Sequence, residues 1–341
     1  MTTQLQYGMG GDRPYSLYYQ HSGKTPISSI VLAGLAGAGA AVVLAVVYGY
    51  IDAYCPYAKL RGIATVFFGL GVGGATAAIA KAGKVRSMAV VLALVGAAAL
   101  VAYYACWVVW IEAAFGRMHF GPNVRLPTYG NLILSPVTFA RCIRFFNENG
   151  YWSLSSSGKD APHGIWLTMI WLGEAAAIFG SALVVARATA RAQMFCEACN
   201  RWCSKPQVLR HTLPGDAGRA RQTLEAHDLA YLTTLQPADS PNRFWTLKHE
   251  RCGRCDDLHA LSIEDHKVTL DKKGKVTSNK AKTLVDRLLL DAGEVETLRH
   301  PAVPAAPVAT APVVQPASPP PPPPGPPPQS PPAPDPTNPL V

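Results

Sequence analysis

The sequence predicts an integral membrane protein: an α-helical bundle of four spans, followed by a small α/β water-soluble module and a disordered proline-rich tail. Charged residues make up only 16% of the 341 residues, against about 25% in soluble domains. Hydrophobic residues make up 49% and gather in the first half of the chain, as in a membrane domain. The second half carries cysteines in CxxC pairs and ends in a run rich in proline.

Four apolar runs are long enough for a helix to cross a bilayer, and they lie at residues 27–51, 62–80, 87–114 and 164–186. Residues 1–26 are polar and contain no long apolar run, so we expect a flexible tail there and no cleaved signal peptide. Gly69 and Gly73 stand in GxxxG spacing. Such small-residue faces favour close helix packing, and they would also allow a homo-oligomer.

A long loop at residues 115–163 joins the third and fourth spans. Within it, Ser135 followed by Pro136 is typical of a helix start. Phe139, Ile143 and Phe146 then recur at helical spacing. We expect a short amphipathic helix, which either lies in the membrane interface or packs on the bundle.

Four spans place both termini on one side of the membrane. The lysines and arginines of the connections are evenly divided between the two sides. The dense cluster Lys81, Lys84 and Arg86 favours the cytoplasm for its side, and the thiol-rich second half favours a reducing compartment. We therefore predict a multi-pass protein of the cell membrane with both termini in the cytoplasm.

The formal net charge of +9 comes partly from basic clusters at the ends of the apolar runs. That placement suits contact with anionic membrane lipid. No basic stripe interleaved with aromatic residues occurs, so no nucleic-acid partner is indicated.

Glu174 stands near the middle of the fourth apolar run. A carboxylate at the bilayer centre costs on the order of 3 kcal/mol, so it should face the bundle. We expect it to act as a proton or cation relay with Tyr103, Tyr104 or Thr168, or to bond a neighbouring helix in its protonated form.

Cys196, Cys199, Cys252 and Cys255 form two CxxC pairs. A CxxC turn presents two thiolates on a rigid loop, and two such turns supply the four ligands of tetrahedral zinc. A site with four protein ligands leaves no position for water, so the predicted cofactor is structural zinc. Cys203 is an alternative ligand, as is His249, and a dithiol redox pair is the alternative to metal.

The two pairs resemble those of the broad zinc-ribbon class, over about residues 195–268. That resemblance implies a small zinc-ribbon-like module, in a class whose members bind nucleic acid, protein or no known partner, and it extends only to the four cysteines named above. The 52 residues between Cys199 and Cys252 exceed the usual gap of about 15 to 20. We interpret the extra length as an inserted helix.

The soluble module is expected at residues 192–300. Its predicted elements are a helix within 216–235, strands at 244–251 and 258–268, a hairpin turn at 271–274, and a final helix over 281–300. Residues 301–341 contain six consecutive prolines and cannot build a core, so we expect polyproline II or disorder there.

No HExxH, GxSxG, P-loop or GxGxxG pattern with suitable flanks occurs in the sequence, so we expect no enzymatic activity. The favoured function is a membrane-anchored scaffold or regulator that recruits a protein partner through the zinc module. Two alternatives stay open: a small proton-coupled transporter that uses Glu174, and a membrane-bound thiol oxidoreductase.

Overall fold

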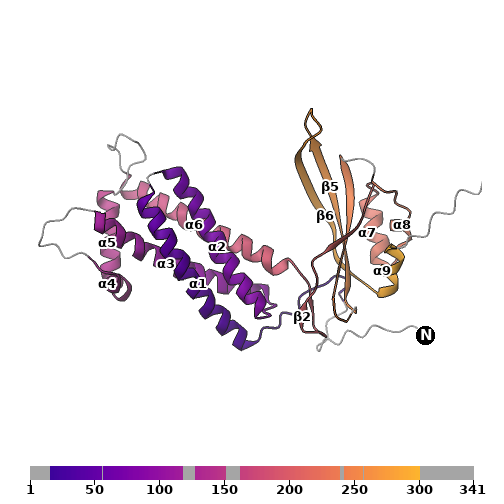
Figure 1. Ribbon diagram of the computed structural model, residues 1–341, viewed down its shortest axis with the longest axis horizontal. Helices are drawn as coiled ribbons and strands as arrows, with labels where there is room; N and C mark the ends of the chain where they lie inside the picture. Colours follow the sequence, from indigo (N-terminus) through magenta and orange to yellow (C-terminus); the bar gives the residue numbers. More distant parts are fainter. Residues whose placement is uncertain are drawn as a thin grey trace, which may run out of the picture. The chain divides into compact units, whose positions relative to one another are not determined.

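The computed structural model describes residues 16–55, 57–117, 127–150, 162–238, 242–255 and 257–299. Within them, a helical part and an antiparallel sheet follow one another along the chain (Figure 1). The tail predicted at 301–341 lies outside the described residues, as do residues 1–15 of the predicted N-terminal tail and parts of the loop at 115–163.

Four helices are long and apolar enough to cross a membrane, which confirms that part of the predicted fold. They are α1 (Ile27–Tyr54), α2 (Ala58–Ala82), α3 (Met88–Arg117) and α6 (Gly164–Arg191). All four extend beyond the apolar runs at one end or both. Polar residues that flank the runs in the sequence therefore belong to the helices.

Small residues bring the long helices into close contact. α1 packs against α2 and α3, and α2 packs against α6. A Cβ on Gly73 would lie closer than 3.0 Å to the backbone of Ala182, and one on Gly69 would crowd Ile178 in the same way. The GxxxG pair therefore serves the contact between α2 and α6 within one chain.

Two shorter helices, α4 (Tyr129–Leu134) and α5 (Pro136–Asn149), lie in the long connection. The side chain of Ser135 accepts a hydrogen bond from the backbone N–H of Thr138 at 3.2 Å, which confirms the predicted helix start. Phe146 is fully buried and contacts Trp110 edge-on, with ring centroids 4.9 Å apart. Of the two expected positions for this helix, the structure shows packing on the bundle.

The second part contains a four-stranded antiparallel sheet in the order β3-β4-β5-β6. Its strands are β3 (Gln207–Thr212), β4 (Arg243–Arg251), β5 (His259–Leu270) and β6 (Val276–Leu290), and a smaller hairpin precedes them as β1 (Phe195–Cys196) and β2 (Arg201–Trp202). Three helices, α7 (Ala217–Glu225), α8 (Ala230–Thr233) and α9 (Ala292–Arg299), complete this part. Leu224, Leu232 and Leu298 from these helices share one core with Trp245 and Leu261 of the sheet.

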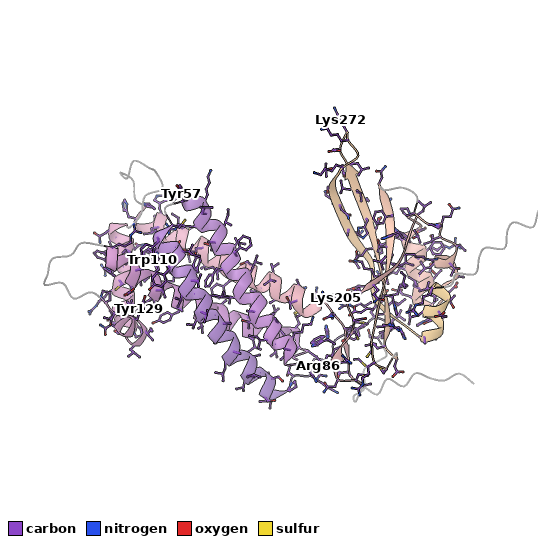
Figure 2. All side chains as sticks on the ribbon, in the orientation of Figure 1. Tyr57, Arg86, Trp110, Tyr129, Lys205 and Lys272 are labelled. Atoms are coloured by element: carbon purple, nitrogen blue, oxygen red, sulfur yellow. The ribbon has the colours of Figure 1, made fainter. Side chains whose placement is uncertain are left out.

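The predicted hairpin turn at 271–274 joins β5 to β6. Asp271 accepts hydrogen bonds from the backbone N–H groups of Lys273 and Lys275, and Gly274 takes the left-handed conformation with φ 74°. Lys272 lies at the exposed end of the hairpin (Figure 2).

The prediction of a helix over 281–300 is wrong for residues 281–290, which form the end of strand β6. Only the second half is helical, as α9. Leu261 of β5 pairs with Leu288, but Ile263 pairs with Val285. Two steps along β5 therefore correspond to three steps along β6, so β6 contains one extra residue, a β-bulge. Arg287 occupies this bulge with a left-handed φ of 54°. The extra residue breaks the alternation of the strand and gives its apolar residues a spacing that imitates a helix.

Part of the segment predicted as a free N-terminal tail contacts the sheet. Tyr18 forms an antiparallel bridge with Leu288. The backbone N–H of Leu289 donates to the carbonyl of Leu17 at 3.0 Å, and that of Tyr19 donates to the carbonyl of Arg287 at 2.9 Å. Residues 17–19 therefore lie along the edge strand β6 and cover part of it.

Candidate metal centre and membrane cavity

Four cysteines from two distant segments meet at the start of the sheet module. Cys196 and Cys199 belong to the β1–β2 hairpin, and Cys252 and Cys255 belong to the turn between β4 and β5. Their sulfur atoms all lie within 4.8 Å of one another. The Sγ atoms of Cys196 and Cys255 are 3.6 Å apart, which is far longer than a disulfide of about 2.05 Å. Sulfurs that bind one zinc ion at about 2.3 Å in a tetrahedron are about 3.8 Å apart, so the donor set fits zinc.

Local backbone geometry holds each pair of cysteines. Asn200 follows Cys199 with a left-handed φ of 50°, a conformation that asparagine tolerates better than most residues. Its N–H donates to the carbonyl of Glu197 and closes the first turn. The second turn is closed by the N–H of Cys252, which donates to the carbonyl of Leu258 at 3.0 Å.

The surroundings of Cys252 favour its thiolate. Burial opposes ionisation, but N–H groups of Cys255 and Arg254 and neighbouring thiols stabilise the anion, and the pKa of Cys252 is lowered to about 7. Burial raises the pKa of Cys196 and of Cys255. Four adjacent thiolates would repel one another unless a cation lies between them. The cluster is therefore better explained as a metal site than as four free thiols.

Cys203 lies beside this cluster but is not one of its four members. It is buried, and burial raises the pKa of its thiol to about 12. His249, the other alternative ligand, has its Nε2 atom 3.0 Å from Nδ1 of His259. The structure therefore brings together the four cysteines of the two CxxC pairs and leaves both alternatives outside.

The sequence gap between the two cysteine pairs contains more than a helix. It holds β2, β3, α7, α8 and all of β4. The insertion supplies β3 and β4, two strands of the four-stranded sheet, and part of the core of that sheet, so the fold is larger than a simple zinc ribbon.

The β1–β2 hairpin, called the metal hairpin here because it carries Cys196 and Cys199, also contacts the connection between α2 and α3. Glu197 forms an ion pair with Arg86, and these side chains are only 22% and 9% exposed. Trp202 donates from Nε1 to the carbonyl of Lys81 at 2.8 Å, and the ammonium of Lys81 lies 5.2 Å from the centre of the indole ring. These contacts link the cysteine cluster to the ends of two membrane helices.

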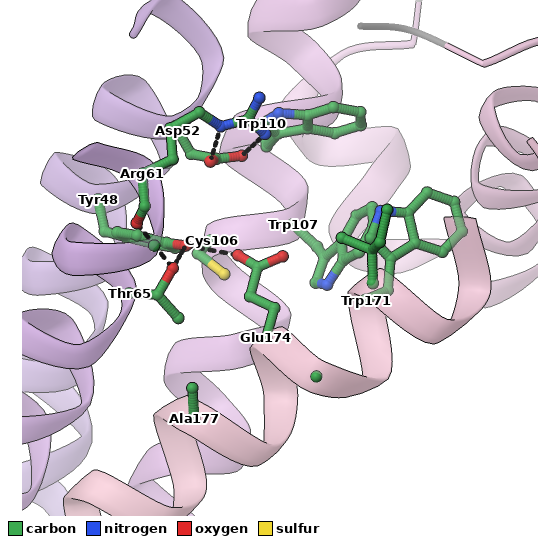
Figure 3. A pocket seen from close by; sticks show the side chains of 14 residues that line it. Tyr48, Asp52, Arg61, Thr65, Cys106, Trp107, Trp110, Trp171, Glu174 and Ala177 are labelled. Atoms are coloured by element: carbon green, nitrogen blue, oxygen red, sulfur yellow. Dashed lines mark hydrogen bonds and ion pairs between the residues drawn. The ribbon is translucent and has the colours of Figure 1, made fainter. Parts of the chain in front are cut away.

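Glu174 lines a cavity of about 350 Å³ within the helical bundle (Figure 3). The phenol of Tyr48 donates a hydrogen bond to the Glu174 carboxylate and shares another with Thr65 at 2.8 Å. At the same cavity, Arg61 binds Asp52 through two hydrogen bonds of 2.6 and 3.1 Å. The remaining polar and aromatic lining includes Cys106, Trp107, Trp110 and Trp171.

The expected partners of Glu174 are corrected by this arrangement. Tyr104 donates to the carbonyl of Leu132 at 2.8 Å, Thr168 accepts from the amide of Asn147 at 2.9 Å, and Tyr103 packs edge-on against Trp107. The partner is Tyr48 of α1, which the sequence alone does not connect with Glu174. The available signal is a tyrosine within an apolar helix, because its hydroxyl needs a hydrogen-bond partner when it is buried.

Comparison with known proteins finds no matching family model, no similar curated protein and no similar solved structure.

Proposed function

We propose that this protein is a membrane-anchored scaffold or regulator whose cytoplasmic module is stabilised by zinc and recruits a protein partner. The observation that carries the proposal is the convergence of four thiols from two segments that are far apart in the sequence. Cys196, Cys199, Cys252 and Cys255 would hold the ion and fill its coordination shell, which is the arrangement of a structural site.

The position of the cysteine cluster suggests that it also fixes the orientation of the sheet module relative to the helices. The β1–β2 hairpin carries two of the ligands and also the residues that contact Arg86 and Lys81. Ordering this hairpin around zinc would therefore fix the module against the cytoplasmic ends of α2 and α3. A module held in one orientation loses less entropy when it binds a partner than a freely tethered one.

The sheet offers a surface for that partner. On the face opposite the shared core, the ring of Phe244 stacks on His266, with centroids 5.0 Å apart, and meets His211 edge-on at 5.2 Å. Lys248 and Glu264 form an ion pair beside them at 2.7 Å. Aromatic residues surrounded by polar groups are typical of protein interfaces.

Site-specific photocrosslinking in intact cells tests the scaffold proposal. A crosslinking amino acid at Phe244 should give a discrete adduct with one protein, and the adduct should be lost when Cys252→Ser is introduced. The same probe at Arg221, on an exposed face of α7, is the control position. Equal adducts at both positions, or none at either, would refute recruitment by this sheet face.

The four clustered cysteines, called the tetrad from here on, also test the alternative of a thiol oxidoreductase. Zinc bound to all four sulfurs leaves no CxxC thiol to cycle between dithiol and disulfide. Measured zinc occupancy of one ion per chain, with the four thiols protected from alkylation, would support the scaffold over the oxidoreductase.

A second candidate function is proton-coupled transport of a small solute, and the cavity around Glu174 favours it. An ionisable residue inside a membrane domain, facing a cavity, is typical of proton-coupled pathways. In proteoliposomes with an imposed pH gradient, a substrate should accelerate collapse of the gradient in the wild type and not in Glu174→Gln. A panel of sugars, amino acids, carboxylates and amines that leaves the gradient unchanged would count against transport.

A further inference from the structure

We propose that the cavity around Glu174 binds a small organic monocation, with the carboxylate as its counter-charge and indole rings as its walls. This inference names the ligand class for the transport candidate above and rests on it only for the location of the site. Equilibrium binding requires no translocation, so the two can fail separately.

The charged side chains that line the cavity do not balance one another. Two carboxylates, Asp52 and Glu174, line it together with one guanidinium, that of Arg61. Arg61 is bound to Asp52 by two hydrogen bonds, so this pair is neutral. Among the described residues, no basic side chain lies within ion-pair distance of Glu174, and its hydrogen bond comes from the neutral phenol of Tyr48. An ionised Glu174 therefore leaves the cavity with one uncompensated negative charge, which a monocation would balance.

Three tryptophans, Trp107, Trp110 and Trp171, lie together at the cavity. Trp107 meets Trp110 at an interplanar angle of 73° with centroids 5.4 Å apart, and it meets Trp171 at 86° and 4.9 Å. These rings are set edge to face, and all three contribute to the cavity wall (Figure 3). The electron-rich face of an indole attracts a cation within about 6 Å, and the attraction grows when water is excluded.

Size and ligand number select an organic cation over the alternatives. The cavity of about 350 Å³ is within the range of small-molecule sites, about 300 to 1,000 Å³. A Ca²⁺ or Mg²⁺ ion requires six or more oxygen ligands. Here the Asp52 carboxylate is committed to Arg61, and apolar rings form much of the rest of the wall. A sugar would need more hydrogen-bonding groups than this wall offers, and an anion would be repelled by Glu174.

The site lies near one end of the helical bundle. Asp52 lies in the last turn of α1 and Arg61 in the first turn of α2, so the cavity begins close to the short connection between these helices. The neutral alternative is a protonated Glu174 whose only role is its hydrogen bond to Tyr48. Saturable binding of a charged probe would distinguish a binding site from this alternative.

The test uses the full-length protein in detergent and a pair of matched probes. Benzyltrimethylammonium carries a positive charge, and neopentylbenzene has the same shape without it. Titration with the cation should change the tryptophan fluorescence saturably, and the neutral probe should give no saturable change. Glu174→Gln should weaken cation binding at least tenfold, whereas Glu112→Gln, the same change outside the cavity lining, should have no effect.

A second measurement keeps the proposal testable if Glu174→Gln does not fold. In the wild type, a hydrophobic carbodiimide should label Glu174, and benzyltrimethylammonium should slow that labelling at least fivefold, while neopentylbenzene should not. Equal binding of both probes, unchanged binding in Glu174→Gln, or labelling that the cation does not slow would overturn the proposal. Cation binding without collapse of a pH gradient would refute transport alone, and gradient collapse by another solute without cation binding would refute only the inference made here.

Discussion

Replacing Cys252 with serine should remove zinc from the sheet module and loosen the β1–β2 hairpin. Structural zinc bound by four ligands contributes about 10 to 16 kcal/mol in small zinc domains, or roughly 2.5 to 4 kcal/mol for each ligand. Since about 1.4 kcal/mol is a tenfold change in affinity, loss of one thiolate should weaken zinc binding roughly 100- to 1,000-fold. Cys252 is almost completely buried, with 1% exposure, so water cannot readily replace the missing sulfur.

The effect on stability follows from ligand linkage. At a free zinc concentration of about 100 times the wild-type Kd, binding stabilises the folded hairpin by about 2.7 kcal/mol. The variant, at or below its own Kd, gains only about 0.4 kcal/mol under the same conditions. The difference of about 2 kcal/mol corresponds to a roughly 30-fold larger equilibrium constant for opening of the hairpin.

The assay combines zinc content with amide hydrogen exchange of the full-length protein in detergent at buffered zinc. Peptides covering β1 and β2 should exchange roughly 30-fold faster in Cys252→Ser. Peptides from the membrane helices should be unchanged. Cys203→Ser is the control, because Cys203 is buried nearby but lies outside the tetrad, and it should retain one zinc per chain. A wild type without zinc would refute the metal centre, and loss of zinc from Cys203→Ser alone would refute the ligand assignment.

Three further predictions concern packing and charge. Gly73→Ala should destabilise the bundle by about 1 to 3 kcal/mol, because its Cβ would press on the backbone of α6. Thermal unfolding in detergent should show this loss of stability. The control variant Gly62→Ala, whose Cβ would meet no atom within 4 Å, should be neutral or stabilising. Glu197→Gln should weaken the contact between the metal hairpin and Arg86 by about 1 to 3 kcal/mol, because that ion pair is mostly buried, and hydrogen exchange of β1 and β2 should rise while zinc is retained. Asp265→Asn should cost the sheet about 1 kcal/mol at neutral pH, because the hydrogen bond from Arg243 lowers the pKa of Asp265.

The sign of the last effect sets its pH window. A carboxyl group whose pKa is lower in the folded state contributes stability above its unfolded pKa of about 3.9 and loses it as the pH falls through the folded value. The difference between wild type and Asp265→Asn, measured by exchange in β4 and β5, should therefore vanish in acid. A difference that persists unchanged at low pH would contradict the ion-pair explanation. Equal behaviour of the two glycine variants, or hairpin exchange in Glu197→Gln that matches the wild type, would contradict the other two.

Several features of the fold could be predicted from the sequence because they depend on local chemistry. The long helices follow from apolar runs, since insertion into a bilayer depends on the hydropathy of each segment. The start of α5 follows from Ser135 and Pro136, which satisfy and shape the first helical turn. The strands on either side of Cys252 follow from their β-branched and aromatic residues and from the cysteine turn between them.

Other features required the tertiary structure because they depend on contacts between distant residues. The bulge at Arg287 places the apolar residues of β6 at helical spacing, and only pairing with β5 shows that they form a strand. The sequence likewise places Glu174 near the middle of an apolar run but does not indicate its partner. Tyr48 is 126 residues away, on another helix.

By itself, then, the sequence determined which segments are apolar enough to cross a membrane and which cysteines have the spacing of zinc ligands. The tertiary structure decided that these four sulfurs meet, that Gly69 and Gly73 face α6, and that Glu174 shares a cavity with a neutral Asp52–Arg61 pair. The physical reason is that hydropathy and turn chemistry are properties of a few consecutive residues. The position of one helix or strand against another depends on packing over the whole domain.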